Sequence, residues 1–136
     1  MYNCYKDCVI EGRILYLTEA MNCALVTSTY TVDVDAHTMF SNITNEVVGT
    51  GYTANGATLG TKTSTQDNTN NRGVMDAADV TWTTSTMTAR AAIIMQWTGT
   101  ASTSELVCYI DFGADKSSSS SDFTISWHAD GILYLG

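Results

Sequence analysis

The sequence predicts a mainly β fold, either an antiparallel β-sandwich or a jelly-roll-like barrel with one or two short helices. Threonine is the most frequent residue and proline is absent, a composition that favours pleated, half-buried strands over helices. The carboxyl-terminal half contains several runs rich in apolar residues, and short polar segments separate them. Such a succession of strands and turns indicates antiparallel pairing.

The size and composition indicate one folded unit. The chain has 136 residues, of which 44% are hydrophobic and 15% are charged, whereas disordered segments are poor in apolar residues and rich in charge. A chain of this length buries about 68% of its unfolded surface in a single core. We expect one β-rich domain over residues 1–136, with residues 1–22 as an amino-terminal arm or short helix packed on it.

The first quarter of the chain predicts a helix followed by extended segments. Apolar residues at helical spacing favour a short helix over Tyr2–Arg13, with Gly12 near its end. Ile14–Leu17 and Cys23–Thr31 are predicted to be extended, because β-branched and aromatic residues are frequent in the second of these runs.

The middle of the chain predicts a second helix and then loops. Apolar residues recur every three or four positions in Asp33–Val47, at Ala36, Phe40, Ile43 and Val47. Either Asp33 or Asp35 is suited to cap a helix there. Four glycines then delimit two brief extended pieces, namely Gly49, Gly51, Gly56 and Gly60. The polar segment Gln66–Gly73 is predicted to be an exposed loop.

The second half predicts the centre of the sheet. Val80–Thr83 alternates between apolar and polar residues, and Met87–Trp97 includes the run Ala91–Met95, which is apolar enough for a strand covered on both faces. Three further strands are predicted at Leu106–Phe112, Asp122–Trp127 and Ile132–Leu135. The serine run Ser117–Ser121 is interpreted as a flexible connection, and Ala129–Gly131 as a turn.

The charge argues against two classes of partner. Six basic and fourteen acidic residues give a net charge of -8, and the resulting field repels phosphate backbones and anionic lipids. No apolar run approaches the roughly 20 residues that cross a bilayer, and Met1–Arg13 carries charges where a signal peptide needs an apolar segment. We expect no nucleic-acid partner and no membrane association, and we expect synthesis in the cytosol.

Residues with reactive side chains form no recognisable motif. His37 and His128 are far apart in sequence, and their spacing to acids, serines and glycines matches no hydrolase, zinc-protease or phosphate-binding motif. The six aspartates that follow lack the spacing of a calcium loop: Asp33, Asp35, Asp76, Asp79, Asp111 and Asp115. We expect neither an enzyme nor a cofactor or metal.

Cysteines and tryptophans are interpreted mainly as core residues. Cys4, Cys8, Cys23 and Cys108 are predicted to be buried thiols, with a disulfide or a metal site as the alternative. Trp82, Trp97 and Trp127 fall in predicted strands. Burial is the more common fate of such tryptophans, and an exposed platform for a ligand is the alternative.

Several short segments of the sequence resemble those of a family of small structural proteins of tailed bacteriophages. These segments are Gly49–Ala54, Asp76–Trp82, Tyr109–Gly113 and Gly131–Leu133. The resemblance extends from about Ala24 to Leu135, and nothing is carried over to the segment before Asn22. It implies a β-sandwich and a non-enzymatic role in the virion. It identifies no functional residues.

The resemblance leads to a specific expectation of function. The chain is expected to be a capsid decoration, or cement, protein that binds the outer surface of the head, bridges major capsid subunits and forms oligomers, with trimers as one option. A tail, neck or fibre component that binds a receptor or a carbohydrate is the alternative. Because tyrosine is enriched at interfaces, the candidate anchors are Tyr2, Tyr5, Tyr52 and Tyr134.

Overall fold

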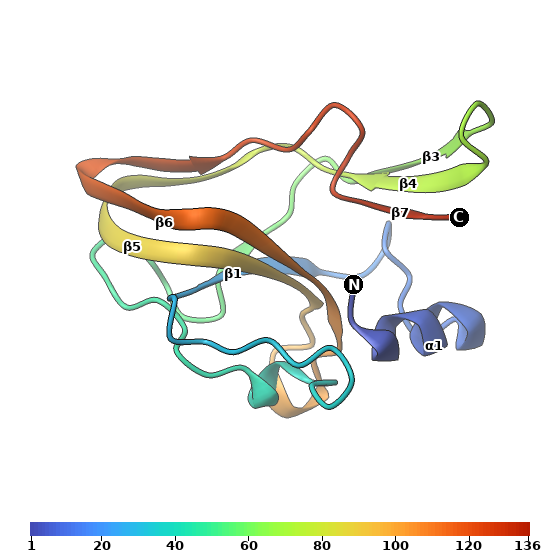
Figure 1. Ribbon diagram of the computed structural model, residues 1–136, viewed down its shortest axis with the longest axis horizontal. Coiled ribbons are helices and arrows are strands. Elements are labelled where there is room, and N and C mark those ends of the chain that lie inside the picture. The colour runs from blue at the N-terminus through green and yellow to red at the C-terminus, as the bar shows by residue number, and fades with distance from the viewer.

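The chain folds into two antiparallel sheets with one short helix, as the computed structural model of residues 1–136 shows (Figure 1). One sheet has the strand order β2-β1-β5-β6 and the other has the order β3-β4-β7. The elements are α1 (Asn3–Glu11), β1 (Met21–Val26), η1 (Phe40–Asn42), β2 (Ala57–Thr58), β3 (Thr63–Asp67), β4 (Arg72–Asp76), β5 (Val80–Gln96), η2 (Ala101–Thr103), β6 (Leu106–Ile125) and β7 (Leu133–Leu135). The prediction of a mainly β, sandwich-like fold is confirmed, and the sheets do not close into a barrel.

A long ribbon of β5 and β6 dominates the architecture. These strands have 17 and 20 residues and pair antiparallel from Val80 with Ile125 to Met95 with Leu106. In Figure 1 the ribbon bends sharply at one end of the molecule, so that its outer part lies above its inner part. The bend coincides with register shifts around Ser85. There the buried Ser85 hydroxyl lies 2.7 Å from the Ser118 hydroxyl and donates to the Ser121 carbonyl at 3.0 Å.

The main core lies between the two layers. Trp82 and Phe123 come from the outer part of the ribbon, and their rings meet edge to face with centroids 6.1 Å apart. Ala92 and Ile94 face them from the inner part, within the same cluster of buried residues. Alternation along β5 places Thr81 and Thr83 in solvent while Trp82 is buried, as expected for a strand with one face in the core.

A second, smaller core covers the other face of the inner sheet. Ala91, Ile93 and Met95 alternate with the residues of the main core and are also fully buried. Phe40 and Tyr30, from the long segment between β1 and β2, cover them. This double burial confirms the prediction that Ala91–Met95 is a strand covered on both faces.

The amino-terminal helix forms where the sequence predicts it. Gly12 has a φ of 68° and ends α1 in the left-handed conformation. The Arg13 amide then donates to the Cys8 carbonyl at 2.9 Å, as in the common glycine-terminated helix end. Tyr5 and Cys8 point into the main core. The arm is therefore part of the domain.

The helix predicted at Asp33–Val47 is wrong. Only Phe40–Asn42 is helical, as one 3-10 turn. The Asp33 carboxylate instead accepts from the backbone amides of Asp35 and Ala36, and the Asn42 side chain accepts from the amides of Thr38 and Met39. Short polar side chains that bond to nearby backbone compete with helix formation in this way.

Three local predictions are corrected by the structure. Ile14–Leu17 forms no strand, because the segment enters a turn at Tyr16–Thr18, where the amides of Thr18 and Glu19 donate to the Leu15 carbonyl. Gln66–Gly73 is not a loop throughout, since Asp67 pairs with Arg72 at the end of the β3–β4 hairpin. The serine run Ser117–Ser121 is part of β6 rather than a flexible connection.

Candidate protein-binding surface

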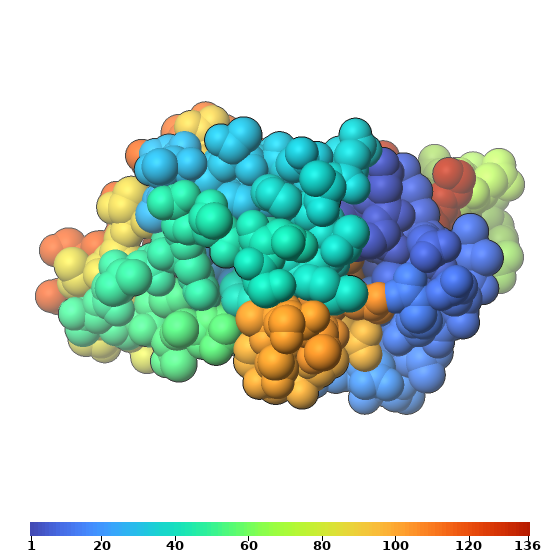
Figure 2. Space-filling model, turned by 90° about the horizontal axis from the view of Figure 1, so that it is seen from below, coloured from blue at the N-terminus to red at the C-terminus, as the bar shows by residue number.

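A patch of exposed apolar side chains lies at one end of the molecule. Seven large hydrophobic residues are exposed in the whole chain, and four of them come from the nine positions 9–17. We call these four the apolar patch: Val9, Ile10, Leu15 and Leu17. Ile10 is 85% exposed, and both leucines are 54% exposed. Figure 2 shows this part of the chain, in blue, on the surface at one end.

The local backbone explains why these side chains point outward. Tyr5 and Cys8 occupy the buried face of α1, so Ile10, two positions beyond Cys8, falls on the opposite face. After Gly12 the side chains alternate, with Ile14 and Tyr16 buried and the two leucines exposed. The Tyr16 hydroxyl donates to the Asp76 carbonyl at 2.6 Å, which fixes this segment to β4. The patch follows from the same packing that buries its neighbours.

One ion pair and one backbone hydrogen bond hold the segment of the patch on the ribbon. The Arg13 guanidinium pairs with Asp7 at 2.9 Å, and with Glu11 and Glu105 as well. Glu105 precedes β6, so Arg13 links the end of α1 to the ribbon. The Tyr2 amide also donates to the Val107 carbonyl at 3.0 Å. A surface held in this way loses little conformational entropy when it binds a partner.

A second exposed group surrounds Tyr134 on β7. The Arg72 guanidinium lies over the Tyr134 ring, 4.6 Å from its centroid. Arg72 is held by Asp67 at 2.8 Å and by Asp130 at 3.5 Å. A hollow of about 480 Å³ beside them is lined in part by Tyr134, Asp130 and His128. We call Asp67, Arg72, Asp130 and Tyr134 the Tyr134 cluster.

Asp67 should make the stability of the wild-type protein depend on acid pH. Hydrogen bonds from Asn70 and Arg72 lower the pKa of Asp67 to about 2, from an ordinary value of 3.8. A carboxyl whose folded pKa is depressed stabilises the protein above its unfolded pKa, and this contribution is lost as the pH falls through the folded pKa. We expect Asp67→Asn to lower the urea midpoint at pH 7, and the difference from wild type to shrink between about pH 4 and pH 2.

Asp115→Asn is the matched control, because Asp115 is exposed and its carboxylate forms neither a hydrogen bond nor an ion pair within the chain. Its urea midpoint should follow that of the wild type at every pH. A constant offset for Asp67→Asn from pH 7 to pH 2 would contradict the role given to the Asp67 charge.

The structure places the four predicted tyrosine anchors in different environments. Tyr2 and Tyr5 are 0% and 3% exposed, so the expectation that they anchor a partner on the surface is wrong for the folded chain. Burial is the main reason that the pKa of Tyr2 is raised and that the pKa of Tyr5 is raised to about 12. Tyr52 is half-buried, and its hydroxyl bridges the Leu25 amide and the Glu46 carboxylate. Tyr134 is 57% exposed and is available to a partner.

The remaining candidate residues are spread over the fold. His37 bonds through Nδ1 to the Tyr30 hydroxyl at 2.8 Å, whereas His128 lies 3.4 Å from Asp130. No group of three His, Cys, Asp or Glu residues is placed to hold a metal ion.

The cysteines and tryptophans are mainly packing residues. Cys8, Cys23 and Cys108 are buried, Cys4 is half-buried, and all four thiols are free. Trp82 is buried, so the alternative of a ligand platform is wrong at that position. The half-buried Trp127 donates its indole N–H to the Ala78 carbonyl at 3.0 Å.

No helix of the chain combines the length and the apolar character needed to span a bilayer. No protein-family model, curated protein or solved structure matches this chain.

The sequence analysis does not predict the apolar patch, although the alternation of residues in this segment contains a signal for it. Leu15 and Leu17 alternate with Ile14 and Tyr16, so one pair of this segment must face away from the core if the other faces it. The sequence-based prediction names tyrosines because they are enriched on average at interfaces. The structure instead exposes mainly aliphatic residues at this end.

Proposed function

We propose that this chain is a non-enzymatic structural protein of a bacteriophage particle that binds the outer surface of the head as a decoration protein. The single observation that carries the binding role is the apolar patch, which concentrates four of the seven exposed large hydrophobic residues in nine positions. Several exposed large apolar side chains within one short segment of a folded domain are typical of a site of interaction. The partner in this proposal is the major capsid protein, in keeping with the sequence resemblance.

The charge and the fold support an outer position on the head. A net charge of -8 is unfavourable beside packaged DNA and favours the side of the shell that faces solvent. The two-layer fold carries its patch on a segment that the Arg13–Glu105 ion pair ties to the residue before β6. A module that touches neighbouring capsid subunits with more than one surface gains from effective concentration, so modest contacts suffice.

Binding to undecorated heads tests this proposal. Full burial of one large aliphatic side chain contributes roughly 1.5–3 kcal/mol, and about 1.4 kcal/mol corresponds to a tenfold change in Kd. We therefore expect Ile10→Lys to weaken binding by a factor of about ten or more when the purified protein is titrated onto heads. Decorated heads should also resist heat better than bare heads.

Val48→Lys is the matched control, because Val48 is 95% exposed and lies outside the apolar patch. This variant should bind as the wild type does, and both variants should unfold at the wild-type temperature. If binding is saturable but the heads gain no resistance to heat, the protein binds heads without stabilising them, and the cement role is wrong. Equal binding by Ile10→Lys and the wild type would remove the patch from the proposal, and absence of binding would remove the head as the partner.

A tail or fibre component that binds carbohydrate is the second candidate, and the Tyr134 cluster favours it. Exposed aromatic rings stack on sugars, while neighbouring charged groups bond to hydroxyls. Arg72 holds the ring of Tyr134 in place, and Asp130 lies beside it. Binding of a glycan array by the wild type but not by Tyr134→Ala would favour this function. The copy number in purified particles separates the two candidates, since hundreds of copies indicate a head and a handful indicate a tail.

A further inference from the structure

A large bulge interrupts the pairing of β6 with β5. Four residues of β6, 112–115, lie opposite the single residue Arg90 of β5. The Asp111 carboxylate braces this bulge, because it accepts from the Arg90 side chain and from the Gly113 amide, both at 2.8 Å. Bulges re-aim side chains and are frequent beside functional sites. The space next to this bulge is therefore a place to look for a second binding site.

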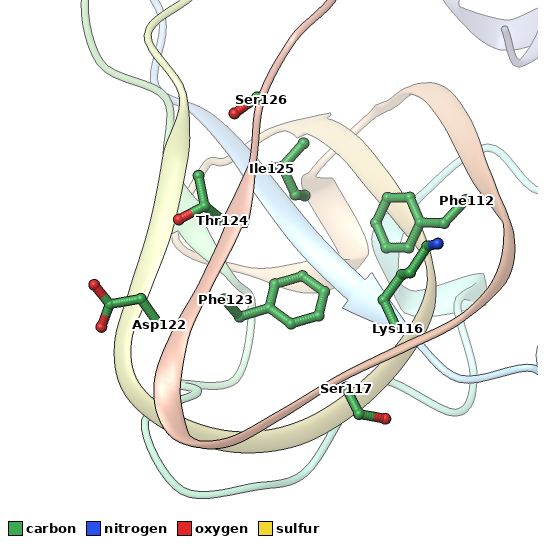
Figure 3. A pocket seen from close by; sticks show the side chains of 8 residues that line it. All are labelled: Phe112, Lys116, Ser117, Asp122, Phe123, Thr124, Ile125 and Ser126. Carbon is green, nitrogen blue, oxygen red and sulfur yellow. The ribbon is translucent and has the colours of Figure 1, made fainter.

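A groove opens between the bulge and the outer part of β6. Its volume is about 460 Å³, and its apolar lining consists of Phe112, Phe123 and Ile125. Figure 3 shows Phe112 and Phe123 facing the same space from the two sides of the bent strand, and their ring centroids are 6.4 Å apart. Phe123 and Ile125 belong to the main core, and Phe112 packs against it. The groove thus exposes the border of the main core.

Lys116, on the rim of this groove, is the one basic side chain without a partner. The other five basic side chains each bond to at least one group of the protein, whereas Lys116 forms neither a hydrogen bond nor an ion pair. In Figure 3 its side chain extends beside Phe112. Asp122 does not neutralise it, because Asp122 points away from the groove and its carboxylate accepts from the Thr84 amide at 3.1 Å. The groove therefore combines an apolar floor with an uncompensated positive charge.

The backbone beside the groove has a free edge. The outer part of β6 pairs with β5 from Phe123 to Ile125, and no strand pairs with its other side. The N–H and C=O groups of an unpaired edge are open to a strand from another molecule. Every second side chain of such a strand would lie next to Phe123 and Ile125, within the groove. The edge and the groove therefore form one site.

We propose that this site binds an extended segment of a partner protein as an additional strand, with apolar side chains in the groove and a carboxylate beside Lys116. In strand addition the backbone hydrogen bonds give affinity, and pockets for alternate side chains give specificity. The phenylalanine rings select apolar residues, and the unpaired Lys116 ammonium selects an acidic one. Because the rings and Lys116 face the same space, the apolar and acidic residues occupy alternate positions of the segment.

This inference goes beyond the proposed function and does not depend on it. The bend of the ribbon and α1 lie at opposite ends of the molecule (Figure 1). A segment bound in the groove therefore leaves the apolar patch free, and failure of either site to bind says nothing about the other.

Peptide binding tests the proposal. The probes are acetylated and amidated peptides of about eight residues, within the usual length of a strand. Isoleucine or phenylalanine alternates with threonine in them, and glutamate takes each apolar position in turn. At least one should bind the wild type with a Kd below about 1 mM in fluorescence anisotropy. Its glutamine analogue should bind roughly two- to fivefold more weakly. A panel without any binder would overturn the proposal.

Charge reversal tests the role of Lys116 with little risk to the fold, because this side chain makes no contact that the substitution breaks. Lys116→Glu should bind the glutamate peptide at least about fivefold more weakly than the wild type does, and it should bind the corresponding lysine peptide more tightly. Lys6→Glu is the control for net charge, since Lys6 is exposed and lies on α1; it should bind as the wild type does. Unchanged affinity of Lys116→Glu would contradict the proposal.

Methylation of the peptide amides separates strand addition from simple apolar contact. The N–H groups of alternate residues in a strand point to opposite sides, so only one alternate set faces β6. Methyl groups on that set should abolish binding, and methyl groups on the other set should leave it unchanged. Equal affinity of the two methylated peptides would show that no strand is added. Self-association of the wild type that Lys116→Glu abolishes would assign the groove to a second copy, which would equally overturn the proposal.

Discussion

Replacement of Gly56 by alanine should strongly destabilise the fold. Gly56 has a φ of 74°, and a Cβ atom at this position would lie 2.0 Å from the carbonyl oxygen of Cys23 and 2.6 Å from Cα of Ala24. These atoms belong to β1, the fully buried strand that pairs with both β2 and β5. The backbone cannot yield without breaking the register of Cys23 with Ala57.

The expected loss is at least about 3 kcal/mol. The left-handed conformation costs a residue with a Cβ roughly 1–2 kcal/mol, and displacement of a central strand adds to this cost. A loss of this size is a large share of the 5–15 kcal/mol that stabilise an ordinary domain. Chemical unfolding at pH 7 should show a much lower midpoint for Gly56→Ala or no cooperative transition.

Gly60→Ala is the matched control, four residues away. Its Cβ would meet nothing within 4 Å, and its φ is outside the left-handed range. This variant should remain within about 0.5 kcal/mol of the wild type or gain slightly, because alanine restricts the unfolded chain. Equal stability of the two variants would show that the close approach of Gly56 to β1 does not constrain the fold.

Local signals explain which elements the sequence predicted well. The helix at Asn3–Glu11 depends on apolar spacing and on Gly12, all within one short segment. Ala91–Met95 is recognisable because five consecutive apolar residues require cover on both faces. The signals for both elements lie within short stretches of consecutive residues, so the sequence of each segment alone is enough to predict them.

The errors arose where distant segments decide the structure. Ser117 and Ser118 have the composition of a linker, yet they pair with Thr88 and Met87 of β5 and become part of a strand. Serine has no strong preference of its own, so the partner strand imposes the conformation. The two separate strands predicted on either side of the serine run are therefore one.

The exposure of the predicted tyrosine anchors also depends on distant segments rather than on local sequence. Tyr2 is fully buried in the second core, where it packs with residues far away in sequence, and its hydroxyl lies 3.0 Å from that of Tyr30, 28 residues away. No residue close to Tyr2 in the sequence predicts this contact. Tyr134 stays exposed because β7 is a short edge strand whose inner neighbours already fill the core. Residue type alone therefore did not separate the core tyrosines from the exposed one.

Trp82→Ala should be among the most destabilising substitutions in the core. Trp82 is 5% exposed and lies between the rings of Tyr52 and Phe123, with centroids 5.9 Å and 6.1 Å away. Because it lies on the outer part of the ribbon, its indole fills the space against the inner sheet. Removal of a buried tryptophan side chain typically costs 3–5 kcal/mol.

The same strand supplies the control and the deciding comparison. Thr83 is exposed and makes no side-chain hydrogen bond, so Thr83→Ala should change stability by less than about 0.5 kcal/mol. Trp82→Phe should recover part of the loss, because a smaller ring still packs between its two neighbours. If Trp82→Ala and Thr83→Ala were equally stable in chemical unfolding, the two layers would not be held together by the core between them, and the bent ribbon would need another source of stability.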